Sequence, residues 1–277
     1  MNNLKENAIK LFLDIFNDKF SINDIKVIKP IHNGYTNSSY YLELNSNEKF
    51  QIRLGENNKI VNRSNEANVL KAINEENYIY YNDKNGNAIK KWIEGRTLNK
   101  KDLKNNEVLL RIFSEIQKYH NLNINNIEII KHDYNLFLKN AKIPKKHLLI
   151  YKKIVSEFDT IPWGFSHNDL NLDNILLTDN NDVVFIDFEW SRINHPYWDY
   201  SNLLKETTWS LKQVKNFSKL SNIDFNSLLK MTYVAINFSY QWTFSNSFSF
   251  KILYYRLKMF FKMCIFLIYL KKVISSS

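Results

Sequence analysis

Four polar residues within eight positions have the types and spacing of a functional loop. His167, Asn168 and Asp169 stand side by side, and Asn174 follows Asp169 by five residues. An apolar run, 175–177, comes directly afterwards and predicts a strand. We therefore expect a loop that holds these polar groups at a fixed place where the chain enters a strand.

A second apolar run ends in an acid a short distance along the chain. Residues 183–186 are apolar and lead into Asp187, eighteen positions after Asp169. The segment between the two runs, 178–182, reads TDNND and is typical of a turn, so the two strands should pair as a hairpin. Pairing would bring Asp169, Asn174 and Asp187 to one end of the hairpin. Carboxylate and amide oxygens are the ligands that Mg²⁺ prefers.

Together, the two motifs resemble those of the choline and ethanolamine kinases and their aminoglycoside phosphotransferase relatives, within the protein-kinase-like superfamily. Those families use H-N-D-L-x-x-x-N in the catalytic loop and I-D-[FYW]-E where protein kinases have D-F-G. The present sequence reads HNDLNLDN at 167–174 and IDFE at 186–189. The resemblance runs from Ile28 to about Met259 and implies transfer of the γ-phosphoryl group of ATP to a hydroxyl group.

This resemblance implies a role for each residue of the two motifs. Asp169 would accept the proton of the attacking hydroxyl, or at least orient it, and would therefore contact the substrate. Asn174 and Asp187 would hold Mg²⁺ against the ATP phosphates, which makes Asp169, Asn174 and Asp187 the predicted catalytic set. Glu189 is a second acid expected near the metal and the substrate. His167 is expected to support the loop by hydrogen bonds.

The residues of the first third of the chain predict an antiparallel sheet flanked by helices. Apolar alternation predicts strands, and helical spacing or a cap predicts helices, as follows: strands at 25–31, 38–44, 49–54, 78–82 and 88–93, and helices at 3–16 and 64–74.

After residue 95 the pattern changes to that of helices. They are expected at 102–120, 133–141 and 145–158, followed by the hairpin region 172–188 and by helices from Pro196 to the end. With the resemblance, this predicts an α+β, bilobal, protein-kinase-like fold. Its antiparallel-sheet N-terminal lobe would span 1–94 and its mainly helical C-terminal lobe 95–277, with a hinge near 93–96.

The resemblance also assigns nucleotide contacts to the N-terminal lobe. The turn NGYTNSS at 33–39 resembles the G-x-T-N turn that covers the phosphates in choline kinases, which points to Gly34, Thr36 and Asn37. Arg53 fits the strand cation that reaches the phosphates, with Glu66 as its expected ion-pair partner.

The segment KKWIEG at 90–95 resembles the hinge strand of these kinases. There the backbone groups of Trp92 and Ile93 would read the adenine of ATP. Together with the residues of the N-terminal lobe, they complete the predicted nucleotide site.

Aromatic residues in the C-terminal region favour a cationic acceptor. After Glu189 there are few acids and many aromatic residues, and quaternary ammonium groups bind aromatic faces. The segments HPYWDY, YQWT and YYR resemble those around the acceptor site of choline kinases and assign Trp198, Trp242 and Tyr254 to substrate binding; Tyr255 stays an open alternative to Tyr254. Ser239 stands where those kinases carry a tryptophan.

Choline is therefore the predicted acceptor, with ethanolamine, thiamine or another amino alcohol left open. The alternatives are an aminoglycoside or thiamine kinase and a catalytically inactive kinase-like binding protein. The hypothesis of a nucleic-acid-binding protein is based on the formal charge of +10 alone. It ranks last, because the lysines are scattered along the sequence.

Composition agrees with a cytoplasmic enzyme that uses ATP and a small-molecule substrate. The 277 residues include a single cysteine, Cys264, which excludes an internal disulfide and fits a reducing compartment. The most apolar stretch, 263–270, is too short to span a bilayer, and the first residues do not resemble a signal peptide. The sequence makes no prediction about the oligomeric state.

Overall fold

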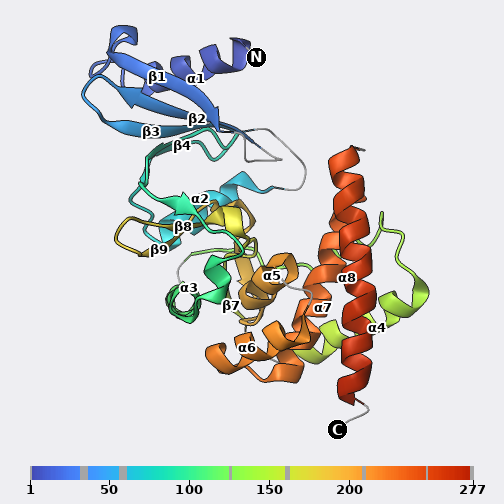
Figure 1. Ribbon diagram of the computed structural model, residues 1–277. Helices are drawn as coiled ribbons and strands as arrows, with labels where there is room; N and C mark the ends of the chain where they lie inside the picture. The colour runs from blue at the N-terminus through green and yellow to red at the C-terminus, as the bar shows by residue number, and fades with distance from the viewer. Residues whose placement is uncertain are drawn as a thin grey trace.

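The computed structural model describes residues 2–31, 37–55, 61–124, 127–159, 163–207, 210–247 and 249–274. A sheet-based N-terminal part lies above a helical C-terminal part in Figure 1. In the described part of the chain, no helix combines the length and apolar content needed to cross a membrane.

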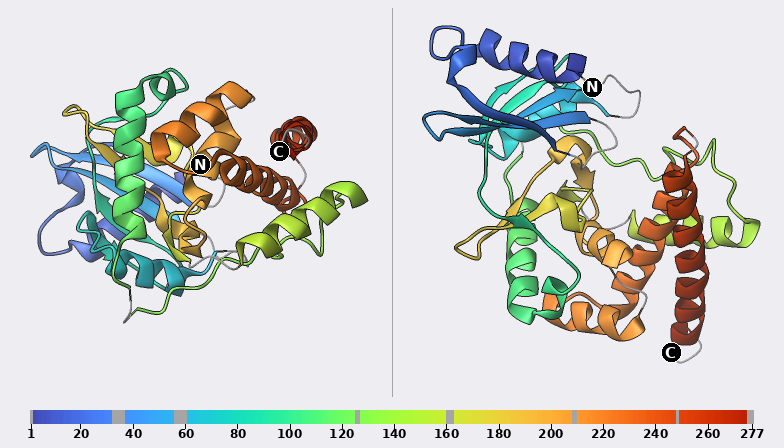
Figure 2. Two further views of the ribbon diagram at one scale, coloured as in Figure 1. Left: turned by 90° about the horizontal axis from the view of Figure 1, so that it is seen from below. Right: turned by 45° about the horizontal axis from the view of Figure 1, so that its top comes forward.

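The N-terminal part is built on a five-stranded antiparallel sheet in the order β1-β2-β3-β5-β4. Its strands are β1 (Ile25–Ile31), β2 (Asn37–Leu44), β3 (Lys49–Gly55), β4 (Tyr78–Tyr81) and β5 (Ala88–Lys91). Helix α1 (Asn2–Ile15) lies across the sheet face that points away from the C-terminal helices (Figure 2). Phe12 of α1 packs on Phe50 of β3 with ring centroids 5.2 Å apart, so a hydrophobic core lies between helix and sheet.

Helix α2 (Arg63–Ala72) follows the third strand and lies against the C-terminal part. Asn62 caps it, because its side chain accepts a hydrogen bond from the backbone N–H of Asn65. The Asn65 side chain in turn donates to the backbone oxygen of Ser191, at 2.9 Å. This short helix therefore connects the sheet to the segment that follows the acidic motif.

The C-terminal part is a bundle of helices around a large core. The helices are α3 (Asn106–His120), α4 (Lys145–Phe158), α5 (Trp198–Thr207), α6 (Leu211–Ser221), α7 (Phe225–Trp242) and α8 (Phe250–Ile274). This part also has 3₁₀ turns at Asp102–Lys104, Leu172–Asn174 and Phe188–Trp190, and a further one, Ile22–Asp24, precedes β1 in the N-terminal part. Helix α7 is buried over most of its circumference, since residues 231–241 are all buried. It is the axis on which α4, α5, α6 and α8 pack.

Two small sheets join the bundle to the N-terminal part. Strands β6 (Arg96–Thr97), β8 (Ile175–Leu177) and β9 (Val183–Phe185) form one, and β7 (Gly164–Ser166) pairs with β10 (Arg192–Asn194) in the other. The predicted hairpin is confirmed, because Ile175 pairs with Phe185 and Leu177 with Val183.

Most other predicted elements are present, with one error. The helix predicted at 133–141 is wrong, since residues 134–140 form turns. Asp133 explains the error: its side chain accepts a hydrogen bond from the backbone N–H of Asn135, which draws the chain into a turn. The helix predicted at 102–120 is interrupted, and α3 begins only after Asn105, whose side chain caps it.

Candidate active site

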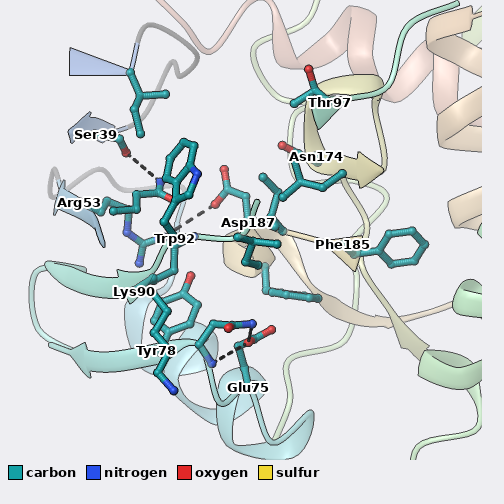
Figure 3. A pocket seen from close by; sticks show the side chains of 18 of the residues that line it. Ser39, Arg53, Glu75, Tyr78, Lys90, Trp92, Thr97, Asn174, Phe185 and Asp187 are labelled. Carbon is teal, nitrogen blue, oxygen red and sulfur yellow. Dashed lines mark hydrogen bonds and ion pairs between the residues drawn. The ribbon is translucent and has the colours of Figure 1, made fainter. Parts of the chain in front are cut away.

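A cavity of about 250 Å³ separates the five-stranded sheet from the β8–β9 hairpin. Side chains from both parts line it, as Figure 3 shows for Arg53, Lys90 and Trp92 on one side and Asn174 and Asp187 on the other. Most of the sequence-predicted nucleotide and metal residues of the described chain therefore line one space: Asn37, Arg53, Trp92, Ile93, Asn174 and Asp187. Glu66 is fully buried and does not line it. Gly34 and Thr36 of the predicted phosphate turn lie outside the described residues.

The loop that carries Asp169 is anchored by a buried acid from α5. The Asp199 carboxylate accepts hydrogen bonds from the backbone N–H groups of His167 (3.0 Å) and Asn168 (2.9 Å). Asn168 has a left-handed backbone, with φ of 66°, which asparagine tolerates better than most residues. The Trp198 indole N–H donates to the Asn168 backbone oxygen, at 3.1 Å. Helix α5 thus fixes the shape of the loop directly before Asp169.

His167 lies in the loop as a supporting residue. Its Nε2 lies 3.0 Å from the backbone oxygen of Ile186, and its Nδ1 accepts from the backbone N–H of Asp169 at 3.3 Å. Burial lowers the pKa of its imidazole, so the ring is neutral at pH 7. One neutral ring therefore joins the Asp169 loop to the strand that leads to Asp187.

Replacing Asp199 with alanine should destabilise the protein by about 3–5 kcal/mol, because two buried backbone donors lose a charged acceptor. Urea unfolding measures this change. The matched control, Asp14→Ala, removes an exposed acid from α1 and should change the free energy of unfolding by less than about 0.5 kcal/mol. Equal stability of the two variants would contradict the anchoring role.

Asp169 and Asn174 form a hydrogen-bonded pair. The Asn174 amide nitrogen donates to the Asp169 backbone oxygen at 2.8 Å and to its carboxylate Oδ2 at 3.0 Å. Burial raises the pKa of Asp169 to about 6, and the nearby Lys205 opposes this shift. Asp169 thus has the pKa of a general base suited to near-neutral pH.

The raised pKa of Asp169 predicts a pH-dependent rate. Below pH 6 the carboxyl group is protonated and cannot accept a proton, so kcat/KM should fall about tenfold per pH unit on the acid side and level off above. Initial rates at saturating metal between about pH 5 and pH 8 check this. The Asp169→Asn variant should lack the acid limb, and a flat wild-type profile would contradict the assignment.

Asp187 lies where the chain leaves the hairpin. Its backbone is left-handed, with φ of 68°, and 40% of its side chain is exposed in the cavity. Desolvation, and after it the neighbouring Glu189, raises the pKa of the Asp187 carboxyl. A group whose charge is disfavoured in this way is one that a bound cation would stabilise.

The donor set at the cavity fits a magnesium ion shared with phosphates. Asp187 supplies a carboxylate, and Asn174 presents its amide oxygen because its amide nitrogen is used by Asp169. No group of three or more His, Cys, Asp or Glu side chains arranged for a metal occurs among the described residues. Mg²⁺ is commonly held by one or two protein oxygens, with water and substrate phosphates completing its shell.

A buried ion network joins α2 to the sheet and to the acidic motif. Arg53 contacts Glu66 at 2.7 Å and Asp187 at 3.7 Å, so the predicted Arg53–Glu66 pair is present. Arg63 contacts Glu66 and Glu189, both at 2.9 Å. Within the described residues, Arg53 Nη2 makes no hydrogen bond although it is buried, which leaves a donor for an anion at the cavity.

Glu189 lies close to Asp187, as expected, but its side chain is buried in the ion network. It is 2% exposed, accepts from the Asn37 amide at 2.8 Å and pairs with Arg63. It therefore ties β2 and α2 to the C-terminal part, and the expectation that it contacts the acceptor is not matched. Asn37 is turned toward this network, and it also lines the cavity.

At the hinge, only part of the predicted backbone is available to a ligand. The Trp92 N–H donates to the Lys49 backbone oxygen at 3.0 Å, so it extends the sheet, whereas the Trp92 side chain and Ile93 line the cavity. Lys90 is a further cation in the cavity wall, lying over the Tyr78 ring at 5.0 Å. Two strand cations, Arg53 and Lys90, thus face the same space.

Two of the predicted acceptor residues are placed differently from the expectation. Trp198 is 2% exposed and supports the loop, so it presents no face to a substrate. Tyr254 is 72% exposed on the outside of α8, and Tyr255 points inward instead, onto Glu206. Trp242 stands at right angles to Tyr255, with ring centroids 6.1 Å apart, so these two rings are the aromatic pair on the inner side.

An ion cluster that the sequence does not predict lies beside this aromatic pair. Glu206 lies 3.4 Å from Lys205 and 3.2 Å from Lys258, and these lysines lower the pKa of its carboxyl to about 2. Lys262 is buried nearby and donates to the Lys205 backbone oxygen. The charge of Lys205 lowers the pKa of Asp169, and that of Glu206 raises it. The acidic and basic residues sit at the end of α5 and on α8, where no sequence motif marks them.

The sequence predicts no role in the site for Arg63 or Asp199. Arg63 stands in the segment RSNE and Asp199 in PYWD, but their partners are distant in the sequence. Arg63 pairs with Glu189, 126 residues away, and Asp199 accepts from the backbone of His167, 32 residues away. Helical amphipathicity predicts that a charged residue is exposed, whereas these two are buried by partners from distant segments.

Comparison with known proteins shows which family this chain resembles in sequence. The sequence model of choline/ethanolamine kinases matches residues 28–232. The chain is 27% identical over 238 residues to the uncharacterized MG356 homolog of Mycoplasma pneumoniae, and the match covers 83% of each chain.

Solved structures show the same fold at low identity. An ethanolamine kinase of Plasmodium vivax gives a TM-score of 0.72 at 16% identity, covering 91% of this chain and 87% of that one. The choline kinase LicA of Streptococcus pneumoniae gives 0.72 at 14% identity, covering 92% and 98%, and LicA in complex with AMP gives 0.70 at 13%, covering 93% and 98%. The fold is thus the bilobal, kinase-like α+β fold.

Proposed function

The chain belongs to the choline/ethanolamine kinase family, and from this premise we propose that it transfers the γ-phosphoryl group of ATP to the hydroxyl group of a small alcohol. The observation that carries the proposal is the convergence at the hairpin of Asp169, Asn174 and Asp187 beside the strand cation Arg53. The binding of AMP by LicA supports a nucleotide in the corresponding cavity.

In this proposal the cavity holds the nucleotide. The Trp92 side chain and the backbone at Ile93 pack on the adenine, while Arg53, held by Glu66, and Lys90 face the phosphates. A magnesium ion between Asn174 and Asp187 would neutralise charge on the transferring phosphoryl group. Arg53 and Lys90 orient that group toward the loop.

Asp169 acts on the acceptor. Its carboxylate accepts the hydroxyl proton as the oxygen attacks, and Asn174 holds one carboxylate oxygen in place during this step. The buried Asp199 keeps the preceding backbone fixed, so the distance between base and acceptor stays short. The protein therefore contributes positioning and electrostatics, which is what phosphoryl transfer requires.

For the acceptor we propose choline or a similar amino alcohol. Family membership supports this class, and the Trp242–Tyr255 pair supplies aromatic faces for an ammonium group near the base. A second acceptor class, an alcohol that carries an acidic group, is favoured by one observation. Lys205, Lys258 and Lys262 surround a single Glu206 on this side of Asp169.

An acceptor panel tests both classes. ADP release is followed with MgATP and, in turn, choline, ethanolamine, thiamine, kanamycin and glycerate. The proposal expects turnover with choline or ethanolamine; turnover with glycerate alone would select the lysine-rich interpretation, and turnover with kanamycin alone would refute both. No stimulated release with any small alcohol would overturn the kinase proposal.

Replacing Trp242 with alanine should raise KM for the amino alcohol by about 2- to 30-fold, the loss of one cation–π contact, with little change in KM for ATP. Steady-state kinetics with each substrate varied separately measure the two constants. Trp163→Ala is the matched control, because the Trp163 ring meets the Lys131 ammonium and the edge-on Tyr134 ring elsewhere. Equal increases in both KM values would indicate a folding defect.

A further inference from the structure

The outer face of α8 carries a straight stripe of exposed apolar side chains. Phe250, Tyr254, Leu257, Phe261 and Ile268 are exposed by 86, 72, 49, 58 and 52%. Spacings of four, three, four and seven residues keep them within about one-sixth of the helix circumference and extend the stripe over about 27 Å. We call these five residues the outer stripe. A stripe of this length on the surface of a globular protein marks a site of interaction.

The charged residues of α8 itself are all positive. Helix α8 contains no Asp or Glu, and it exposes Lys251, Lys271 and Lys272. Any surface that covers the stripe therefore meets exposed lysines near both of its ends.

Helix α4 lies beside the second half of α8. Cys264 of α8 lies 3.9 Å from the His147 ring of α4. Next to this contact, Lys146 is exposed and so close to Lys271 that it lowers the pKa of the Lys271 ammonium. Leu149, one turn further along α4, is 60% exposed. Figure 1 shows α8 at one side of the molecule with α4 next to it.

We propose that the outer stripe and its lysines dock on the surface of a membrane that contains anionic lipids. A helix with apolar residues on one face and lysines beside them inserts that face at the boundary between headgroups and acyl chains. Each lysine near an anionic surface adds to the attraction. This proposal goes beyond the phosphotransferase activity and does not depend on it.

The positive charge of the helix favours an anionic membrane, and not a second copy of the chain, as the partner of the outer stripe. Two α8 helices packed along their stripes would bring the exposed Lys251 and Lys272 of both copies close together, and neither helix carries an acid. The net charge of +10 opposes self-association further and favours an anionic surface.

Vesicle binding tests the proposal with the full chain. The protein is sedimented with phosphatidylcholine vesicles and with vesicles that also contain phosphatidylglycerol. We expect binding to the anionic vesicles only, and a decrease as salt rises from about 0.05 M to about 0.5 M. Absence of binding to the anionic vesicles, or equal binding to both kinds, would overturn the proposal.

Two double substitutions locate the contact. Tyr254→Ser with Phe261→Ser should lower partitioning at least about tenfold, and Lys271→Glu with Lys272→Glu should lower it by a similar factor. The controls place the same kinds of change elsewhere: Ile22→Ser with Leu110→Ser at exposed apolar positions, and Lys5→Glu with Lys10→Glu on α1. Circular dichroism verifies that each variant is folded.

The controls make the outcome decisive. If the Lys5/Lys10 variant loses as much binding as the Lys271/Lys272 variant, binding reflects net charge and the proposal fails. If sedimentation equilibrium shows a dimer that the Tyr254/Phe261 variant disrupts, while vesicles bind neither protein, the outer stripe is a contact between copies and the proposal fails as well.

Discussion

Replacing Asp169 with asparagine is expected to lower the rate of phosphoryl transfer by about 10²–10⁴-fold, the usual contribution of a general base. Asparagine has nearly the same volume and still accepts the hydrogen bond that Asn174 donates to Asp169 at 3.0 Å. The loop should therefore keep its shape while losing the group that accepts the proton. Single-turnover transfer from labelled ATP measures the chemical step.

The affinity for MgATP separates this loss from a general defect. Asp169 does not line the cavity that we assign to the nucleotide, so the dissociation constant of MgATP should change less than about threefold. Asp179→Asn, in the exposed turn between β8 and β9, is the matched control and should keep the wild-type rate. A wild-type rate in the Asp169 variant would remove Asp169 from the mechanism.

Replacing Asp187 with asparagine should reduce transfer by at least about 10³-fold, because a bound metal contributes several kcal/mol to the stabilisation of charge in the transition state. The variant should also need a higher concentration of Mg²⁺ for half-maximal rate. A titration of rate against Mg²⁺ at constant ATP measures both effects. The matched control is Asp182→Asn, which changes an exposed acid of the same hairpin turn.

The same variant should be as stable as the wild type or more stable. The pKa of Asp187 is raised in the folded protein, so its ionised form is less favourable there than in the unfolded chain. This cost grows as the pH rises above the unfolded pKa and is complete above the folded pKa. A neutral side chain removes the repulsion from Glu189. We therefore expect a higher or unchanged melting temperature at pH 7, together with lost activity. A large drop in stability would contradict the interpretation that the Asp187 carboxylate serves to bind a cation.

The parts of the site that could be predicted from the sequence are those encoded locally. The turn 178–182 joins two short apolar runs, so hairpin pairing follows from turn residues and strand length, and it brings Asn174 and Asp187 to the cavity. The Arg53–Glu66 pair follows from a strand and the next helix. In each case the residues that determine the contact are close in sequence or belong to a motif.

The parts that could not be predicted depend on distant partners or on the orientation of a helix. Helix α8 is apolar on several faces, so its periodicity does not distinguish Tyr254, which is exposed, from Tyr255, which meets Glu206. The sequence predicts that Trp198 contacts the substrate, yet its indole donates a hydrogen bond to Asn168, a loop residue thirty positions earlier. Similarly, Arg63 and Glu189 meet across 126 positions. The proposed lobe boundary between 94 and 95 stays a prediction.

Phosphorus NMR of the reaction mixture tests the central claim most directly. With MgATP and the acceptor that stimulates ADP release, the wild-type protein should form one phosphomonoester for each ADP, and the Asp169→Asn variant should form neither at a comparable rate. Free phosphate in place of the ester would show an ATPase that does not transfer to an alcohol. Such a result, or an ester formed equally by the variant, would contradict the assignment of this site to phosphoryl transfer through Asp169.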